Sequence, residues 1–338
     1  MDQLGMVDVH VAAGTDGGAS GDAESIAKMT AVDYLTRLPP QEEAGIELMV
    51  NLLRQADDRS ITLVVIASLK DVALMLRKEL ELCCQKLKEV VIMGGVESFT
   101  PGKAAEGVFL KPDSAHNNEF DRASSSFVYQ TLQERGVPMA VVSRFTAYAC
   151  QVPKTIFDQM ADTGSRIGVH LRTTQRYAIE KLWQRASAPE GSDIRHGLPA
   201  RCDRAWFLKT FCGGSEKLEG KAAPTADDSI WDFVQGFNMY DPLALCVALP
   251  ALSSFFRPVE FVVNGTVHRV YGVSPEDNGV VDGPSLRDWL VAGFLEGITQ
   301  SQLDKEGPEQ AEIRRLRAEN AMLREALKAA ELRAEQKS

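Results

Sequence analysis

The stretch Glu89-Val-Val-Ile-Met-Gly-Gly95, followed later by Asn118-Glu-Phe-Asp121, decides the fold. Its core, Val90-Val91-Ile92, is a short run of β-branched apolar residues, which is typical of a strand covered on both faces of a parallel sheet. The strand ends at Gly94 and Gly95, where no Cβ keeps the backbone away from a ligand. Ligands of parallel sheets bind beyond the carboxyl ends of the strands, so the stretch predicts a binding site there. A plain buried strand followed by an acidic helix N-terminus is the alternative.

The chain on either side alternates between strand and helix patterns. Strands are expected at 7–13, 61–66, 89–93 and 139–142, and helices at 41–55, 72–80 and 123–135. Apolar strands alternating with helices predict an α/β layered fold with a mainly parallel sheet.

The second half of the chain is expected to be mostly helical. Helices are expected at 154–187, 242–249 and 286–298, with an irregular segment at 188–230. Pro242 suits the first turn of its helix, which places Asp241 just before the helix N-terminus. The dipeptide Asn264-Gly265 predicts a type I′ turn between two strands of a hairpin.

Composition limits the class of protein. The 338 residues are 44% hydrophobic, enough for one large core or a core with an appendage. A net charge of −10 argues against nucleic acid and anionic membranes as partners. The six cysteines form no C-x-x-C pair, no signal peptide is recognisable, and no apolar run reaches the length of a membrane span. We therefore expect a soluble, cytoplasmic protein.

The residues after 303 differ in kind from the rest. Residues 1–303 are expected to form one domain, and 304–338 a linker with a coiled-coil helix. The heptad pattern places Ile313, Asn320, Leu327 and Ala334 at a, and Leu316, Leu323 and Ala330 at d. A single Asn at an a position favours a parallel two-stranded coiled coil, and hence a homo-oligomer. A solvated single helix is the alternative.

Three spaced motifs resemble those of the inosine/uridine-preferring nucleoside hydrolase family. They are Val90–Gly95 (VVIMGG), Asn118–Asp121 (NEFD) and Tyr240–Ala244 (YDPLA), in the order of the family's I-V-x-M-G-G, E-F-N and H-D-P-L-A. The resemblance runs over roughly residues 8–300. It implies an enzyme that hydrolyses the N-glycosidic bond of purine and pyrimidine ribonucleosides. It also implies a Ca²⁺ ion that binds the ribose and the attacking water.

The resemblance assigns substrate contacts to the first two motifs. Glu119 matches the family residue that binds ribose hydroxyls, and Asp121 stands where the family has Asn. Asn118, Gly94 and Gly95 complete the implied substrate-binding set.

Further roles are implied for Tyr240, Asp241 and Lys70. Asp241 matches a late metal ligand of the family, and Lys70 occupies the place of a residue whose main-chain carbonyl binds the metal. Tyr240 replaces the His that often protonates the leaving base, and a phenol can donate a proton there.

The family's N-terminal D-x-D-x-x-x-D-D, which supplies the general base and most metal ligands, has no counterpart in this sequence. Asp16 and Asp22 have neither its spacing nor its place. We therefore expect an N-terminal strand to be missing and hydrolysis to be slow or absent. A truncated hydrolase, a pseudoenzyme that binds ribosides or partners, and a purely structural or interaction protein all remain open.

Overall fold

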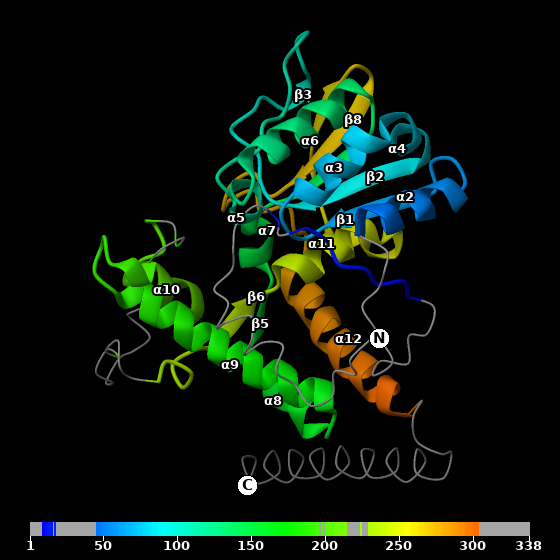
Figure 1. The fold of residues 1–338 in the computed structure, drawn as a ribbon. Coiled ribbons are helices and arrows are strands. Elements are labelled where there is room, and N and C mark those ends of the chain that lie inside the picture. The colour runs from blue at the N-terminus through cyan, green and yellow to red at the C-terminus, as the bar shows by residue number, and fades with distance from the viewer. Residues whose placement is uncertain are drawn as a thin grey trace, which may run out of the picture.

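A mostly parallel sheet forms the centre of the protein (Figure 1). The structure is a computed structural model that describes residues 9–15, 17, 45–195, 198, 200–214, 224 and 229–303. The strands of this sheet are β1 (Ile61–Val65), β2 (Leu87–Met93), β3 (Gly102–Lys103), β4 (Met139–Val142), β7 (Val259–Val263) and β8 (Thr266–Tyr271). They lie in the order β1-β2-β4-β8-β7-β3, and every neighbouring pair is parallel except the β7–β8 hairpin. The predicted α/β fold with a mainly parallel sheet is confirmed.

Helices cover both faces of the sheet. One face is covered by α2 (Gly45–Gln55), α3 (Lys70–Lys78), α4 (Leu80–Lys86) and α6 (Arg122–Glu134). The other face packs against α11 (Tyr240–Ala248), which contacts β1, β2 and β4. Along β2, Val90 and Ile92 pack into the core on the side of α2, α3, α4 and α6, whereas Val91 and Met93 pack into the core on the side of α11. This alternation explains why the strand is apolar at every position.

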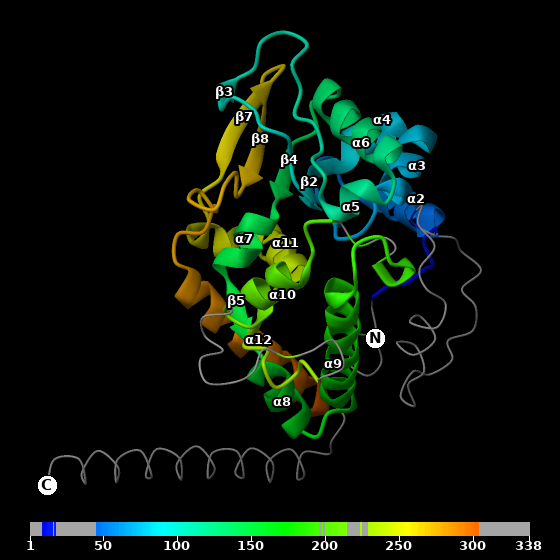
Figure 2. The same ribbon diagram turned by 90° about the vertical axis from the view of Figure 1, so that its left-hand side faces the viewer.

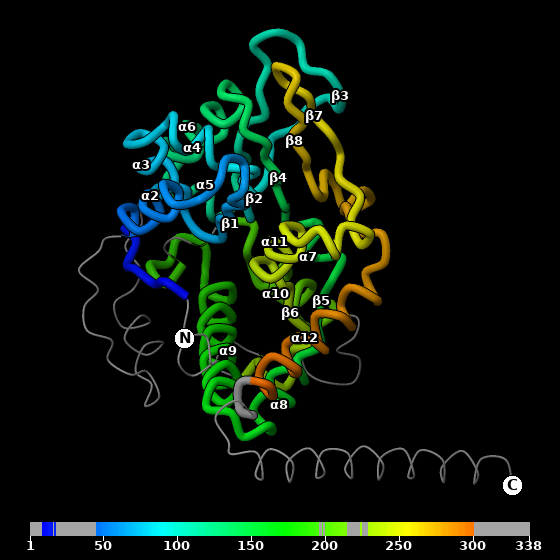
Figure 3. The backbone as a smooth tube through the Cα atoms, turned by 90° about the vertical axis from the view of Figure 1, so that its right-hand side faces the viewer, coloured from blue at the N-terminus to red at the C-terminus, as the bar shows by residue number. Residues whose placement is uncertain are grey.

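The remaining elements lie at the lower edge of the sheet or below it in the figures (Figures 2 and 3). They are α5 (His116–Glu119), α7 (Arg144–Ala149), α8 (Thr155–Asp162), α9 (Arg166–Ser187), α10 (Arg204–Phe211), α12 (Gly283–Leu303), two 3₁₀ turns (Asp193–Arg195 and Pro250–Phe255), and β5 (Gln151–Pro153) paired antiparallel with β6 (Gly236–Asn238). The hairpin α8–α9 packs against α10 and α12 there.

Two expectations from the sequence are wrong, and one is refined. The segment expected to be helical over 154–187 forms two helices, which are divided at Gly164, whose φ of 77° is left-handed. The segment expected to be irregular contains α10, which Asp203 caps by accepting the N–H of Trp206 at 2.8 Å. Residues 9–13 form no strand, because Ala13 bonds the start of α2 through Gly45 instead of a sheet neighbour.

The predicted hairpin is confirmed. Both turn residues have positive φ, 50° at Asn264 and 79° at Gly265, as a type I′ turn requires.

The carboxyl ends of the central strands lie level with one another. Met93 of β2 pairs with Val142 of β4, and Val142 pairs with Tyr271 of β8. The N–H of Gly94 then bonds the carbonyl of Val142 at 3.0 Å. This carboxyl edge of the sheet is where a ligand of the fold would bind.

His268 gives the fold a dependence on pH. The side chain is fully buried on β8, and its Nδ1 accepts the N–H of Met139 at 3.2 Å. Nε2 has no partner within the described residues, and burial lowers the pKa of His268 to about 4. Because the folded-state pKa lies below the ordinary value, the stabilising effect of the neutral ring is complete above about pH 6.5 and is lost as pH falls towards 4.

We expect His268→Gln to remove this part of the pH dependence, because Gln keeps an acceptor for Met139 but does not titrate. The wild-type chain should lose about 3 kcal/mol more unfolding free energy than the variant between pH 7 and pH 4. Urea unfolding of both proteins at the two pH values measures the difference. Equal losses would show that protonation of His268 is not coupled to unfolding.

Some residues singled out in the sequence are not among those that the structure describes. The coiled coil expected within 304–338 lies outside them, as do Asp16 and Asp22. Among the helices of the described part, none is long and apolar enough to cross a membrane.

Candidate active site

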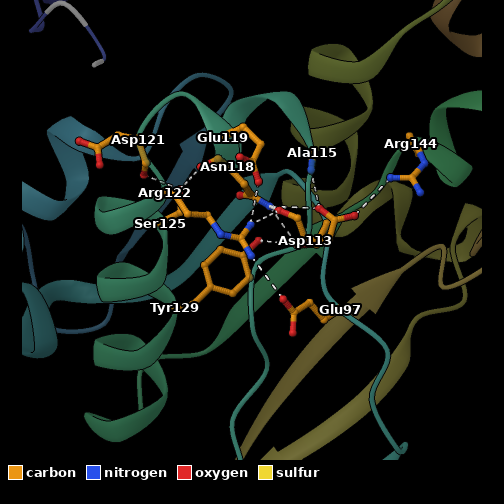
Figure 4. A network of polar contacts seen from close by, with 11 residues as sticks. Glu97, Asp113, Ala115, Asn118, Glu119, Asp121, Arg122, Ser125, Tyr129 and Arg144 are labelled. Carbon is orange, nitrogen blue, oxygen red and sulfur yellow. Dashed lines mark hydrogen bonds and ion pairs between the residues drawn. The ribbon is translucent and has the colours of Figure 1, made fainter. Parts of the chain in front are cut away.

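Asp113 is the centre of a polar network at the carboxyl edge (Figure 4). Its Oδ1 accepts the N–H of Ala115 at 2.8 Å and Nδ2 of Asn118 at 3.2 Å, and its Oδ2 accepts Nη1 of Arg144 at 3.2 Å. Its own N–H donates to the carbonyl of Gly95 at 3.1 Å. Its side chain is only 18% exposed. Asp113 therefore joins the end of β2 through its backbone N–H, and α5 and α7 through its carboxylate.

Gly95 is a glycine because Asp113 packs on it. A Cβ at Gly95 would lie 2.4 Å from the carboxylate of Asp113, and one at Gly94 would lie 3.1 Å from Oδ1 of Asn118. Both glycines are buried. Because both glycines lack a Cβ, the side chains of Asp113 and Asn118 can lie close to the backbone of this turn.

The side chains of Asn118 and Tyr129 bind the same turn through hydrogen bonds. Nδ2 of Asn118 and the hydroxyl of Tyr129 each donate to the carbonyl of Gly95, both at 3.1 Å. Because Nδ2 has only acceptors around it, the orientation of this amide is fixed. Oδ1 is buried and has no partner within the described residues. The predicted substrate-binding Asn118 thus lies at the expected edge, with its amide group used to support the glycines.

Glu119 lies in the same network, paired with Arg122. Nη1 of Arg122 contacts a carboxylate oxygen of Glu119 at 3.2 Å and also bonds the carbonyl of Asp113, while Nη2 contacts Glu97 at 3.3 Å. The Glu119 side chain is half exposed. Glu119 therefore faces solvent at the predicted place, but its charge is already partly compensated by a guanidinium.

Asp121 caps a helix. It accepts the N–H and the hydroxyl of Ser124, both at 2.9 Å, at the start of α6. The Ser124 N–H is the main cause of the lowered pKa of Asp121, and Lys70 also lowers it. Its expected contact with substrate stays a prediction.

Helix α7 connects this network to Tyr240 and Asp241. Arg144 and Tyr148 lie one turn apart on the same face of α7. The ring of Tyr148 contacts that of Tyr240, with centroids 6.3 Å apart. Burial raises the pKa of Tyr240, so its hydroxyl is a weaker acid than a free phenol. Asp241 lies in the first turn of α11, one residue inside the helix rather than before it, and partial desolvation raises its pKa.

The described donors do not fit a calcium site. Ca²⁺ takes about six to eight oxygen ligands. No three His, Cys, Asp or Glu side chains within the described residues form a group that can hold a metal. Lys70 is the first residue of α3, where its carbonyl oxygen accepts an N–H of the next helical turn. The metal roles of Asp241 and Lys70 stay predictions, and no reaction step is assigned to a metal.

Asp113, Arg122, Tyr129 and Arg144 were not predicted. Arg144 is the second residue after β4, and the rule that singled out Gly94 at the end of β2 applies equally to the end of β4. Asp113, Arg122 and Tyr129 could be assigned to the site only from the structure. There, the bridge between Val96 and Pro112 brings the end of segment 96–112 back to the sheet edge.

Comparisons with known proteins identify the fold family. A search of curated proteins finds no match. Among solved structures, the chain is similar to type III effector XopQ in complex with adenosine diphosphate ribose (29% identity, TM-score 0.60, 75% of this chain and 65% of that chain). It is also similar to effector protein XOO4466 (26% identity, TM-score 0.58, 75% and 64%). The matches span a little less than two thirds of the length of these two proteins.

A more distant likeness concerns the fold alone. The purine-preferring ribonucleoside hydrolase of Gardnerella vaginalis matches 88% of this chain and 83% of its own, at 14% identity and a TM-score of 0.51. The family model for inosine-uridine preferring nucleoside hydrolase matches residues 3–282, which is most of the chain. The chain therefore belongs to the inosine-uridine preferring nucleoside hydrolase family.

Proposed function

We propose that the chain binds the ribose of a riboside at the carboxyl edge and hydrolyses the N-glycosidic bond of ribonucleosides only slowly. The observation that carries the proposal is the network around Asp113. It brings Gly94, Gly95, Asn118 and Glu119, which the family motifs assign to substrate, into one contiguous group. Family membership over residues 3–282 supplies the class of ligand.

Glu119 is the residue proposed to hold the ribose. A half-exposed carboxylate accepts hydrogen bonds from sugar hydroxyls, and such charge-assisted bonds are stronger than neutral ones. Arg122 orients this carboxylate through its contact at 3.2 Å.

Slow hydrolysis follows from the state of Tyr240 and Glu119. In hydrolysis, a water oxygen forms a bond to C1′ and releases a proton to solvent, while the bond from C1′ to the base nitrogen breaks and the departing base takes up a proton. Tyr240 is proposed to supply that proton, but burial raises its pKa and makes the transfer less favourable near neutral pH. The positive charge of Arg122 also partly compensates the negative charge of Glu119, which reduces stabilisation of an oxocarbenium-like sugar.

A binding experiment tests the proposal. We expect calorimetry to detect binding of adenosine, inosine or adenosine diphosphate ribose, the last chosen because a relative's structure contains it. Glu119→Gln should weaken binding about tenfold or more, because it removes a charged acceptor. Glu134→Gln is the control, since Glu134 lies at the far end of α6.

Base release, followed by chromatography, completes the test. We expect little free base from inosine or uridine, with or without added Ca²⁺. If none of these ribosides binds, the proposal is refuted, and a role as a structural or interaction protein is favoured. Rapid release of base would refute the slow chemistry while leaving the ribose site intact.

A further inference from the structure

Arg144 has hydrogen-bonding capacity left over at the carboxyl edge. A guanidinium carries five N–H donors. In the described part of the chain, its one hydrogen-bond partner is Asp113, through Nη1. The guanidinium also lies over the ring of Phe145, 4.7 Å from its centroid. Its other nitrogens are turned away from Asp113 (Figure 4), and the side chain is 34% exposed.

The contrast with Arg122 shows that this is particular to Arg144. Arg122 donates to the carbonyl of Asp113 and to Glu119 through Nη1, and to Glu97 through Nη2, so both of its terminal nitrogens have partners. Both arginines belong to one network, yet only Arg144 keeps Nε and Nη2 without partners among the described residues.

The position of Arg144 is fixed by the fold. It is the second residue after β4, and Ser143 caps α7 by accepting the N–H of Phe145 at 3.1 Å. The adjacent strand end is tied to Gly94 through the carbonyl of Val142. The Asp113 carboxylate, mostly buried, then holds the guanidinium at the edge where a riboside is proposed to bind.

We propose that Arg144 recognises the phosphate or diphosphate of an anionic riboside, so that the site selects phosphorylated ribosides over nucleosides. This inference rests on the proposed function, which places the ribose at the same edge. A planar fork of donors matches a phosphate bidentately, whereas a neutral nucleoside offers these donors no charged partner. Tyr148, 42% exposed and one turn further along the same face of α7, adds an aromatic surface beside the cation.

Calorimetry of the full chain with adenosine diphosphate ribose and with adenosine tests the proposal. The wild-type chain should bind the diphosphate at least about tenfold more tightly than the nucleoside. Arg144→Gln should weaken binding of the diphosphate alone, so that the two affinities fall within about twofold of each other. Arg144→Lys should give an intermediate ratio, because it keeps the charge but not the fork.

The matched control is Arg135→Gln. Arg135 is 38% exposed and pairs with a single acid, Glu81, at the far end of α6, so this variant should leave both affinities unchanged. A second readout needs no variant. Raising the salt concentration should weaken binding of the diphosphate and leave adenosine unaffected.

The outcomes separate the two proposals. Equal wild-type affinities for the two ligands, or equal weakening of both by Arg144→Gln, would overturn the role of Arg144 while the ribose site stands. Failure of the wild-type chain to bind either ligand would overturn the proposed function and this inference with it.

Discussion

Replacing Gly168 by alanine is expected to lower the free energy of unfolding by about 3 kcal/mol or more. Gly168 is buried in the first turn of α9, where that helix crosses the end of α8. A Cβ at this position would lie 2.0 Å from the carbonyl oxygen of Met160 and 3.0 Å from the nitrogen of Ala161. These are backbone atoms of α8, so no side chain can turn aside and the two helices must separate.

The same substitution elsewhere should have the opposite sign. Gly293 lies in α12, and a Cβ there would meet no atom within 4 Å. Alanine at this position should therefore gain about 0.5–1 kcal/mol, since it lowers the entropy lost in forming the helix. Urea unfolding of the two variants beside the wild type measures both shifts. Similar changes at both positions would mean that helix propensity, and not the contact with α8, controls the stability.

Local signals carried the prediction of the fold a long way. Strand β4 was expected at 139–142 and lies there, because a short apolar run is bounded by Gly136 before it and the helix-capping Ser143 after it. The Asn264-Gly265 turn was equally clear, since few residues adopt the backbone angles that its type requires. Both features depend on neighbours in the sequence.

The errors arose where a local signal was present but weighed too little. Thr163-Gly164-Ser165 divides the region expected to be helical, and Gly164 adopts the left-handed angle that ends α8. Asp203 was a helix start within a segment that looked irregular. In both places long apolar periodicity, or its absence, outweighed a single capping residue.

The site was predicted in part because only its outline is local. Gly94 and Glu119 stand out by motif, whereas Asp113 lies in a loop with no periodic pattern. Its importance comes from its bond to Arg144, 31 residues away, and from its bond to Asn118, which in turn donates to the carbonyl of Gly95, 23 residues before Asn118. Such pairings depend on the order of strands in the sheet, which the sequence does not display.

Asp113→Ala is expected to have the largest effect on the site. It removes the acceptor of Ala115, of Asn118 and of Arg144 together. Because Nδ2 of Asn118 keeps the carbonyl of Gly95 and the guanidinium of Arg144 is partly exposed, we expect a total cost of about 1–3 kcal/mol. We therefore expect a lower unfolding free energy, and a loss of affinity for adenosine diphosphate ribose of more than tenfold. Calorimetry and urea unfolding measure the two effects.

Asp113→Asn separates the two effects. The amide oxygen can still accept from Ala115 and Asn118, so the fold should be retained, but the amide nitrogen faces the guanidinium of Arg144 and cannot pair with it. If Asp113 acts on the ligand by positioning Arg144, the substitution should weaken binding of the diphosphate and leave adenosine unchanged. On the Arg144→Gln background it should then add nothing, because the group that it positions is already gone. Additive losses in the double variant would instead mean that Asp113 affects the ligand by a route other than Arg144.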